Sequence, residues 1–157
     1  MALLTHAGGY AQFATAPSKL AIPLPSSVSD AEMAALPTQG LTAYFTLTAS
    51  TELRPGESVL VHGGSGGVGS VAIQTARLLG AGLIIATAST EEKRALARGI
   101  GADTAISYDS PDWPEEVLKC TNGRGVDVGD IFEQNFECLA PFGRHIIYGS
   151  TPGTCWK

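Results

Sequence analysis

The sequence predicts an α/β fold in which helices cover a parallel, doubly wound sheet. A short apolar run from Val59 to Val61 is bounded by turn residues, as is typical of a buried parallel strand. Strand-like and helical stretches then alternate along the chain, which favours a parallel sheet. The 157 residues are 44% hydrophobic and 16% charged, enough for one domain with a packed core.

The first strand leads into a glycine motif. Gly64, Gly66 and Gly69 match G-x-G-x-x-G, helical spacing follows from Ser70, and Gly80 ends the helix. A strand, a glycine turn and a helix in this order begin a dinucleotide-binding βαβ unit. The glycines permit a tight turn, close approach of backbone N–H groups to a pyrophosphate, and close helix–strand packing. The helix N-terminus adds its positive dipole end.

The segment before this unit differs in pattern. Gly8–Thr15 alternates like a strand, and Lys19–Pro25 is expected to be extended because it contains prolines. Two such pieces cannot form a sheet alone, so we expect them to be the end of another domain. Ser29 and Glu32 predict a capping box for a helix that Pro37 is expected to end.

A second helix is predicted over 39–49, and Thr51–Gly56 forms a turn. The residues of this helix available for burial are Leu41, Ala43, Tyr44, Phe45 and Leu47.

The remaining elements follow the glycine helix. Strands are predicted at Gly82–Ala88, Thr104–Tyr108, from Val126 to Val128, and at Arg144–Gly149. Helices are predicted over Thr90–Ile100, with Ser89 or Thr90 as the cap, over Pro111–Cys120 and over Ile131–Leu139. The expected strand order is 3-2-1-4-5.

Composition argues against several kinds of partner. The net charge is −5 and no Lys/Arg cluster is present, which argues against nucleic acid and anionic membranes. No apolar run approaches the ~20 residues of a membrane helix, and no signal peptide is recognised, so we expect a cytoplasmic protein. The cysteines make no C-x-x-C, so reduced thiols and no metal site are predicted. They are Cys120, Cys138 and Cys155.

Six motifs together resemble one family. They are Gly8–Gln12, Ala35–Tyr44, His62–Gly69, Gly101–Asp103, Gly123–Asp127 and Cys138–Arg144. In this order they resemble the cofactor domain of the medium-chain dehydrogenase/reductase superfamily, and most closely its zinc-free quinone oxidoreductase (zeta-crystallin-like) branch.

The resemblance implies a Rossmann-type, NADPH-binding domain over residues 25–157. Residues 1–24 are then the C-terminal remnant of a β-rich, GroES-like substrate domain. The implied activity is NADPH-dependent hydride transfer to a small-molecule quinone or other α,β-unsaturated carbonyl (enone), by a parent protein that forms a homodimer.

The chain departs from the family pattern at two further places. Val128 is followed directly by Gly129 and Asp130, where family members carry a few more residues. The sequence also ends at Lys157, before the family's sixth strand. We therefore expect a cofactor domain that is incomplete at strand 4 and at the C-terminus, with little or no turnover alone. If the deletion is real, the central strand should be truncated and the chain poorly folded.

The cofactor preference depends on the end of the second strand. NAD-binding proteins usually place an acid there to accept from the ribose 2′-OH. Here Ser89 and Thr90 occupy the position and Lys93 follows one helical turn later, which suits the 2′-phosphate of NADPH. The resemblance places Tyr108 beside the same phosphate.

Two alternatives stay open at this site. Ser89 or Thr90 can simply cap the helix, with Lys93 a solvated surface charge. Glu91 and Glu92 keep NAD possible as cofactor, although acids also suit the first turn of a helix.

The resemblance places further residues at the nicotinamide end. The full predicted cofactor site is Thr42, Gly64, Gly66, Gly67, Val68, Gly69, Ser89, Thr90, Lys93, Tyr108, Tyr148, Gly149, Ser150 and Thr151. Tyr148 can equally be a core aromatic, and Thr42 a helix-surface hydroxyl.

No catalytic residue is predicted, because hydride transfer is the cofactor's own reaction. His62 follows the first strand, and a lone histidine there favours a packed, hydrogen-bonded role over acid/base work. Two other functions remain open. One is an enoyl reductase domain of a fatty-acid or polyketide synthase, and the other is a non-catalytic NADPH-binding module.

Overall fold

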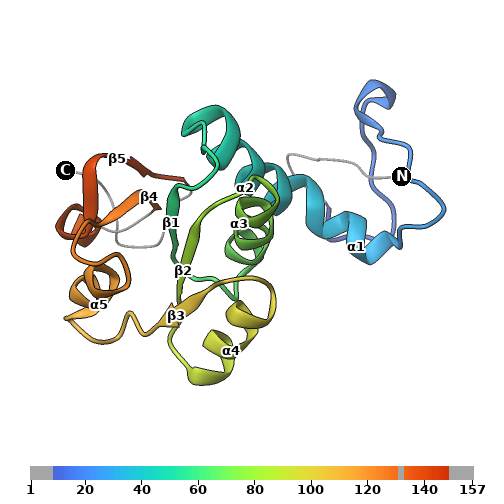
Figure 1. The fold of residues 1–157 in the computed structure, drawn as a ribbon. Coiled ribbons are helices and arrows are strands. Elements are labelled where there is room, and N and C mark those ends of the chain that lie inside the picture. Colours follow the sequence, from blue (N-terminus) through green and yellow to red (C-terminus); the bar gives the residue numbers. More distant parts are fainter. Residues whose placement is uncertain (1–8, 131–132, 149–157) are drawn as a thin grey trace.

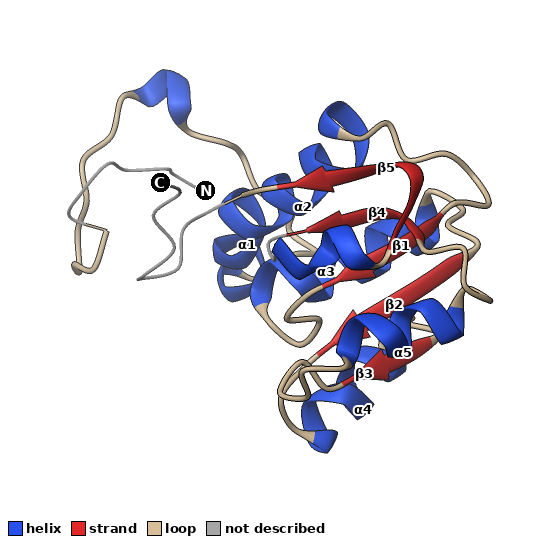
Figure 2. Cartoon of the chain, turned by 90° about the vertical axis from the view of Figure 1, so that its left-hand side faces the viewer, coloured by secondary structure: helices blue, strands red, loops and turns tan. Residues whose placement is uncertain are grey.

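The computed structural model describes residues 9–130 and 133–148. Five parallel strands form one sheet in the order β3-β2-β1-β4-β5, which confirms the predicted fold class and strand order (Figures 1 and 2). The strands are β1 (Ser58–Val61), β2 (Leu83–Thr87), β3 (Thr104–Ile106), β4 (Val126–Asp130) and β5 (Leu139–Ile146). The α-helices are α1 (Asp30–Ala35), α2 (Leu41–Phe45), α3 (Gly67–Leu78), α4 (Glu91–Gly99) and α5 (Trp113–Cys120).

Helices cover both faces of the sheet. On one face, α2, α3 and α4 pack against side chains such as Val59, Val61 and Ile84. On the other face, α5 and Cys138, the residue after the 3-10 helix η4 (Glu133–Glu137), cover Leu60 and Ile85. Figure 1 shows this division, with α5 on the opposite side of the strands from α3. Because neighbouring strand residues point to opposite faces, one apolar run supplies both cores.

The expectation that Pro37 ends a helix is wrong. Helical backbone runs from Asp30 to Ser50, with two π-helical turns, η2 (Leu36–Gly40) and η3 (Thr46–Ser50), on either side of α2. Pro37 is the second residue of η2, where a missing N–H is tolerated, and the N–H of Leu41 bonds back to the Leu36 carbonyl.

Burial along this run follows the expected pattern only in part. Ala43 and Leu47 are buried against the sheet. Leu41, Tyr44 and Phe45, which were also expected to be available for burial, are 45%, 49% and 53% exposed. The run therefore presents one narrow face to the core, formed by Ala43 and Leu47.

The fourth strand is not truncated. Gly129 and Asp130 extend it to five residues, and it pairs with both β1 and β5. The predicted helix over Ile131–Leu139 is wrong in kind and extent. The described part is the 3-10 helix η4, and Leu139 already belongs to β5, which therefore begins five residues before the predicted start at Arg144.

The segment before α1 contains no strand among residues 9–17, contrary to the strand-like pattern. The short 3-10 helix η1 (Ser18–Leu20) follows. The capping box is confirmed: the Ser29 hydroxyl accepts from the Glu32 N–H, and the Glu32 carboxylate accepts from the Ser29 N–H. Within the described ranges, every helix is too short or too polar to span a bilayer.

Candidate cofactor site

The glycine loop joins β1 to α3 at the carboxyl edge of the sheet. The N–H of Gly64 donates to the Thr87 carbonyl at 2.9 Å, which ties the loop to the end of β2. A Cβ on Gly69 would lie 2.3 Å from the Gly63 carbonyl oxygen, so only glycine permits this approach of helix and turn. The sequence therefore produces the tight strand–turn–helix unit that the motif predicted.

The N-cap residue of α3 provides no side-chain hydrogen bond to the first turn of the helix. Gly66 is that N-cap and makes no such bond, and Gly67 and Val68 begin the helix. The backbone N–H groups of a first helical turn lack intrahelical partners and attract anions. The Gln39 carboxamide lies directly against Gly67, in the space that a Cβ there would occupy. A glycine-rich loop beside first-turn N–H donors is the arrangement that fits a pyrophosphate.

The end of β2 is a basic region. Thr90 caps α4, because its hydroxyl oxygen accepts from the Lys93 N–H at 3.3 Å. Arg94 donates to the carbonyls of Ala88 and Ser89 at 3.1 and 2.9 Å. Between the two open candidates for the cap, the structure thus selects Thr90. Lys93 is exposed.

Glu91 is already committed to two arginines. Its carboxylate pairs with Arg94 at 3.0 Å and also with Arg98. Hydrogen bonds from Arg98 and then Arg94 hold the pKa of Glu91 below its usual value. Glu92, the other acid that keeps NAD possible, is exposed. Tyr108, expected to end the third strand, lies two residues after β3 and is 36% exposed.

The described residues predicted at the nicotinamide end, Thr42 and Tyr148, make hydrogen bonds to different partners. Thr42 donates its hydroxyl hydrogen to the Thr38 carbonyl at 2.7 Å, within the helical run. Tyr148 follows β5 and donates to Asp130 at 2.9 Å. The other three predicted residues, Gly149, Ser150 and Thr151, lie outside the described residues.

A buried polar network lies beneath this edge, and the sequence analysis did not predict it. His62 Nε2 lies 2.8 Å from Asn135 Oδ1, and His62 Nδ1 lies 2.8 Å from Thr87 Oγ1. The Asn135 amide donates to the Asp130 carbonyl at 2.5 Å, so its oxygen faces His62 as an acceptor. This network assigns the hydrogen of the neutral ring to Nε2 and makes Thr87 the donor to Nδ1.

His62 is thus a packed, hydrogen-bonded residue, as predicted. Its ring stacks edge-on against Trp113, with centroids 4.9 Å apart. Burial lowers the pKa of His62 to about 4, although the Asn135 hydrogen bond opposes the change. The ring is therefore neutral at physiological pH and joins the end of β1 to the end of β2 and to η4.

Asp130 completes the network at the end of β4. Its Oδ1 accepts from the His62 main-chain N–H and its Oδ2 from the Tyr148 hydroxyl, both at 2.9 Å. The residue is 6% exposed, and burial raises its pKa to about 7 against the effect of these hydrogen bonds. In the sequence, only its position just after Val128, where family members carry more residues, could have drawn attention to Asp130.

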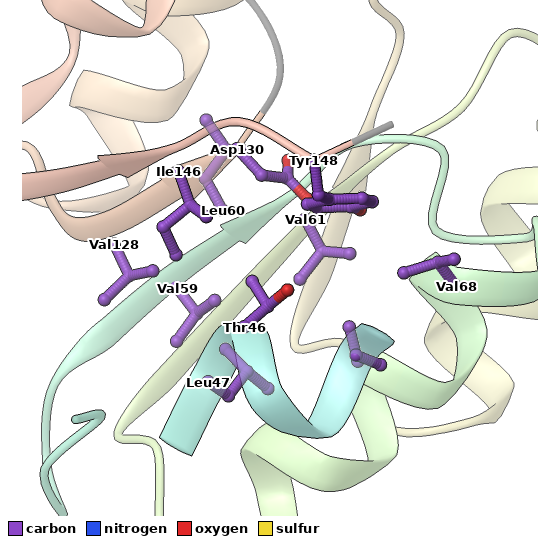
Figure 3. A pocket seen from close by; sticks show the side chains of 12 residues that line it. Thr46, Leu47, Val59, Leu60, Val61, Val68, Val128, Asp130, Ile146 and Tyr148 are labelled. Atoms are coloured by element: carbon purple, nitrogen blue, oxygen red, sulfur yellow. The ribbon is translucent and has the colours of Figure 1, made fainter. Parts of the chain in front are cut away.

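A narrow pocket opens beside Asp130. Side chains of α2, η3, α3, β1, β4 and β5 line it, and all are apolar except Thr46, Asp130 and Tyr148. Figure 3 shows the Asp130 carboxyl and the Tyr148 ring next to each other above Val61. In the described ranges no group of three or more His, Cys, Asp or Glu side chains could hold a metal ion.

Comparison with known proteins defines the family. The profile of the zinc-binding dehydrogenase family matches residues 67–155, and the chain belongs to this family. Its solved relatives include quinone oxidoreductases and enoyl reductases of the zinc-free medium-chain dehydrogenase/reductase group. The resemblance read from the motifs is thereby confirmed.

Individual relatives are single reductases and domains of large synthases. The chain is 36% identical to a 2-haloacrylate reductase of a Burkholderia species over 93% of its own length and 46% of that enzyme. It is 41% identical to a highly reducing polyketide synthase of Aspergillus niger, over 90% of its length and 6% of the synthase.

Solved structures give the same picture. The Thermus thermophilus quinone oxidoreductase, also solved in complex with NADPH, is 35% identical, with a TM-score of 0.81 over 91% of this chain and 47% of that one. A probable oxidoreductase of Mycobacterium abscessus reaches a TM-score of 0.84 at 33% identity, over 92% of this chain and 47% of that one. The chain thus spans about half the length of the single reductases that it matches.

Proposed function

We propose that this chain is the cofactor-binding part of an NADPH-dependent oxidoreductase that reduces a quinone or another α,β-unsaturated carbonyl. The observation that carries the proposal is the glycine loop at the carboxyl edge, where α3 begins without a side-chain cap. Ligands of open α/β sheets bind at this edge. The quinone oxidoreductase solved with NADPH has the same fold and supports the choice of cofactor.

The chain's own residues would bind and orient the cofactor, which supplies the hydride. Backbone N–H groups of the loop from Gly64 to Gly69 would hold the pyrophosphate. Ser89, Thr90 and Lys93, with Tyr108, would hold the adenosine 2′-phosphate. Tyr148 and Thr42 would lie toward the nicotinamide.

The preference for NADPH over NADH rests on charge at the end of β2. Glu91, one of the two acids that kept NAD open, is paired with Arg94 and Arg98. Lys93 is exposed on the same helix. A dianionic phosphate would therefore meet the exposed Lys93 there, whereas Glu91 is paired with two arginines.

Calorimetric titration with NADPH and NADH tests this proposal. We expect NADPH to bind more tightly, and Lys93→Ala to weaken NADPH about tenfold while NADH is unchanged. Lys119→Ala, which removes an exposed cation from α5 on the opposite face, is the matched control. Equal affinity for both nucleotides would contradict the NADPH preference, and binding of neither would contradict the cofactor site.

An enoyl reductase domain of a synthase is the second candidate, favoured by the 41% identity to a polyketide synthase. Reduction of an enoyl thioester in preference to a quinone, by the parent protein, would establish it. Tight NADPH binding without any reduction would instead indicate a non-catalytic module. We further propose that the parent protein forms a homodimer, as the family resemblance implies.

A further inference from the structure

The two carboxyl oxygens of Asp130 face partners of different chemistry. Oδ1 lies 2.9 Å from the main-chain nitrogen of His62, which can only donate. Oδ2 lies 2.9 Å from the hydroxyl oxygen of Tyr148, which can either donate or accept. The pair lines the pocket between α2 and the sheet.

This asymmetry fixes where a proton on Asp130 must reside. A hydrogen on Oδ1 would point at the N–H of His62, so the protonated acid carries its hydrogen on Oδ2. Oδ2 then donates to Tyr148 Oη, and the hydrogen bond survives with its direction reversed. The hydrogen of the Tyr148 hydroxyl is released from the pair and can point to another acceptor.

We propose that Asp130 sets the hydrogen-bonding role of Tyr148 toward a ligand at the carboxyl edge of the sheet. With Asp130 ionised, the Tyr148 hydrogen is held by the carboxylate and the hydroxyl offers only lone pairs. With Asp130 protonated, Tyr148 donates to a carbonyl oxygen of the ligand. Tyr148 is the contacting residue, and Asp130 is a positioning residue that acts through it.

This inference rests on the proposed function, which brings carbonyl oxygens to this edge. One source is the carboxamide of the nicotinamide and the other is the quinone or enone. Both present the same acceptor, so the same switch would serve either. The pocket walls around the pair are otherwise apolar apart from Thr46, which favours a neutral carbonyl over an anion.

The switch operates near neutral pH because of the groups that surround Asp130. Burial raises the pKa of Asp130 to about 7. The ring of His62 on β1 stays neutral because burial lowers its pKa to about 4. Burial also lowers the pKa of His145 on β5, and burial together with Asp130 raises that of Tyr148. Of these groups, Asp130 is the one whose carboxyl contacts the Tyr148 hydroxyl directly, so its proton decides the direction of that hydrogen bond.

Two substitutions separate the states. In Asp130→Asn, the amide oxygen still accepts from the His62 N–H while the amide nitrogen donates to Tyr148, so the variant fixes the state of the protonated acid. Tyr148→Phe removes the hydroxyl altogether. Asp112→Asn and Tyr10→Phe make the same chemical changes at exposed positions and serve as controls.

Infrared spectroscopy of the ligand-free chain gives the first test. The phenol C–O stretching band of Tyr148, isolated by subtracting the Tyr148→Phe spectrum, reports whether the hydroxyl donates or accepts. We expect this band to shift between about 1.5 pH units below and above the pKa of Asp130 in the wild-type chain. In Asp130→Asn it should stay at its low-pH position. A band whose position does not change with pH, or that shifts equally in Asp130→Asn, overturns the inference.

Ligand binding gives the second test, with one arm for each source of the carbonyl. The ratio of affinities for NADPH and adenosine 2′,5′-bisphosphate isolates the nicotinamide end, because both ligands share the adenosine 2′-phosphate. Duroquinone, titrated into the chain saturated with NADP⁺ so that no reduction occurs, isolates the substrate. In at least one arm, we expect the affinity of the wild-type chain to fall about two- to tenfold as the pH rises across the range used in the infrared test.

The variants decide between the outcomes. Asp130→Asn should keep the tighter binding and Tyr148→Phe the weaker binding at every pH, and both controls should follow the wild type. If the affinities of the wild-type chain do not change with pH in either arm, the inference is overturned. If neither nucleotide binds at all, the proposed function fails, and the infrared arm still decides the role of Asp130.

Discussion

Two aspartates three residues apart on β4 have pKa values that are shifted in opposite directions. Asp127, near the amino end of the strand, accepts from the N–H and hydroxyl of Ser58, the first residue of β1. Asp130, at the carboxyl end, accepts from the N–H of His62, the residue that follows β1. Both therefore join β4 to β1, but the pKa of Asp127 is lowered and that of Asp130 is raised to about 7.

The charge of the partners explains the difference. Burial opposes ionisation of both carboxyls. At Asp127 this effect is outweighed by Arg124, 2.5 Å away, together with the two bonds from Ser58. At Asp130 the donors are an amide and a phenol, both neutral, and burial prevails. The amino edge is thus held by ion pairs, including that of Glu57 with Arg144, and the carboxyl edge by neutral hydrogen bonds.

The largest expected effect is on the neutral edge. His62→Ala leaves the buried Asn135 Oδ1 and Thr87 Oγ1 without their partner and opens a cavity beside Trp113. We expect the free energy of unfolding to fall by about 3–5 kcal/mol in urea denaturation. Tyr10→Ala, at a fully exposed aromatic, should change it by less than about 0.5 kcal/mol. A loss of similar size in both variants would contradict the structural role of His62.

The pH dependence of stability sharpens the comparison within the neutral edge. The folded state raises the pKa of Asp130 from 3.8 to about 7, so it holds extra protons and its stability falls as pH rises through that window. It lowers the pKa of His62 from 6.5 to about 4, so stability rises with pH between those values. The two contributions oppose each other between about pH 4 and 6.5.

Asp130→Asn should expose the contribution of His62. We expect the free energy of unfolding of this variant to rise by about 3 kcal/mol from pH 4 to 6.5, relative to a flatter wild-type profile. Urea midpoints at a series of pH values measure it. Parallel profiles of the variant and the wild type would show that Asp130 does not titrate as described.

The sequence predicted the layout that repeats across α/β proteins. The apolar run of β1, the glycine motif and the alternation of elements are local patterns, and the strand order is the one usual for the dinucleotide-binding fold that they indicate. The capping box at Ser29 and the packed role of His62 could also be predicted from the sequence. Each depends on neighbours within a few residues or on a position at a strand end.

The parts that sequence reasoning missed depend on contacts between distant residues. Asp130 lies 68 positions from His62, and its raised pKa comes from burial that no local pattern encodes. Pro37 was expected to end a helix because the π-helical turn that accommodates it has no sequence signal of its own. The fourth strand kept its length because Gly129 and Asp130, which follow Val128 where family members carry more residues, pair with neighbouring strands.

A smaller loss is expected at the charged edge. Asp127→Ala leaves the Ser58 N–H and hydroxyl without their acceptor and Arg124 without its ion-pair partner. We expect a loss of about 2 kcal/mol in urea denaturation, whereas Asp127→Asn, which keeps one acceptor oxygen, should lose about 1 kcal/mol. Equal losses would mean that the negative charge, which both variants remove, carries the whole effect and that the acceptor oxygen kept in Asp127→Asn is unimportant.

Salt gives the smallest effect and the sharpest division between the two edges. At about 1 M salt the Debye length falls to about 3 Å, so the partly exposed pair of Asp127 and Arg124 is screened while buried neutral bonds are not. The loss caused by Asp127→Ala should therefore shrink by about 0.5 kcal/mol between about 0.1 M and 1 M sodium chloride. The loss caused by His62→Ala should stay constant. If both losses shrank equally, the two edges would not differ in charge as their hydrogen-bond partners indicate.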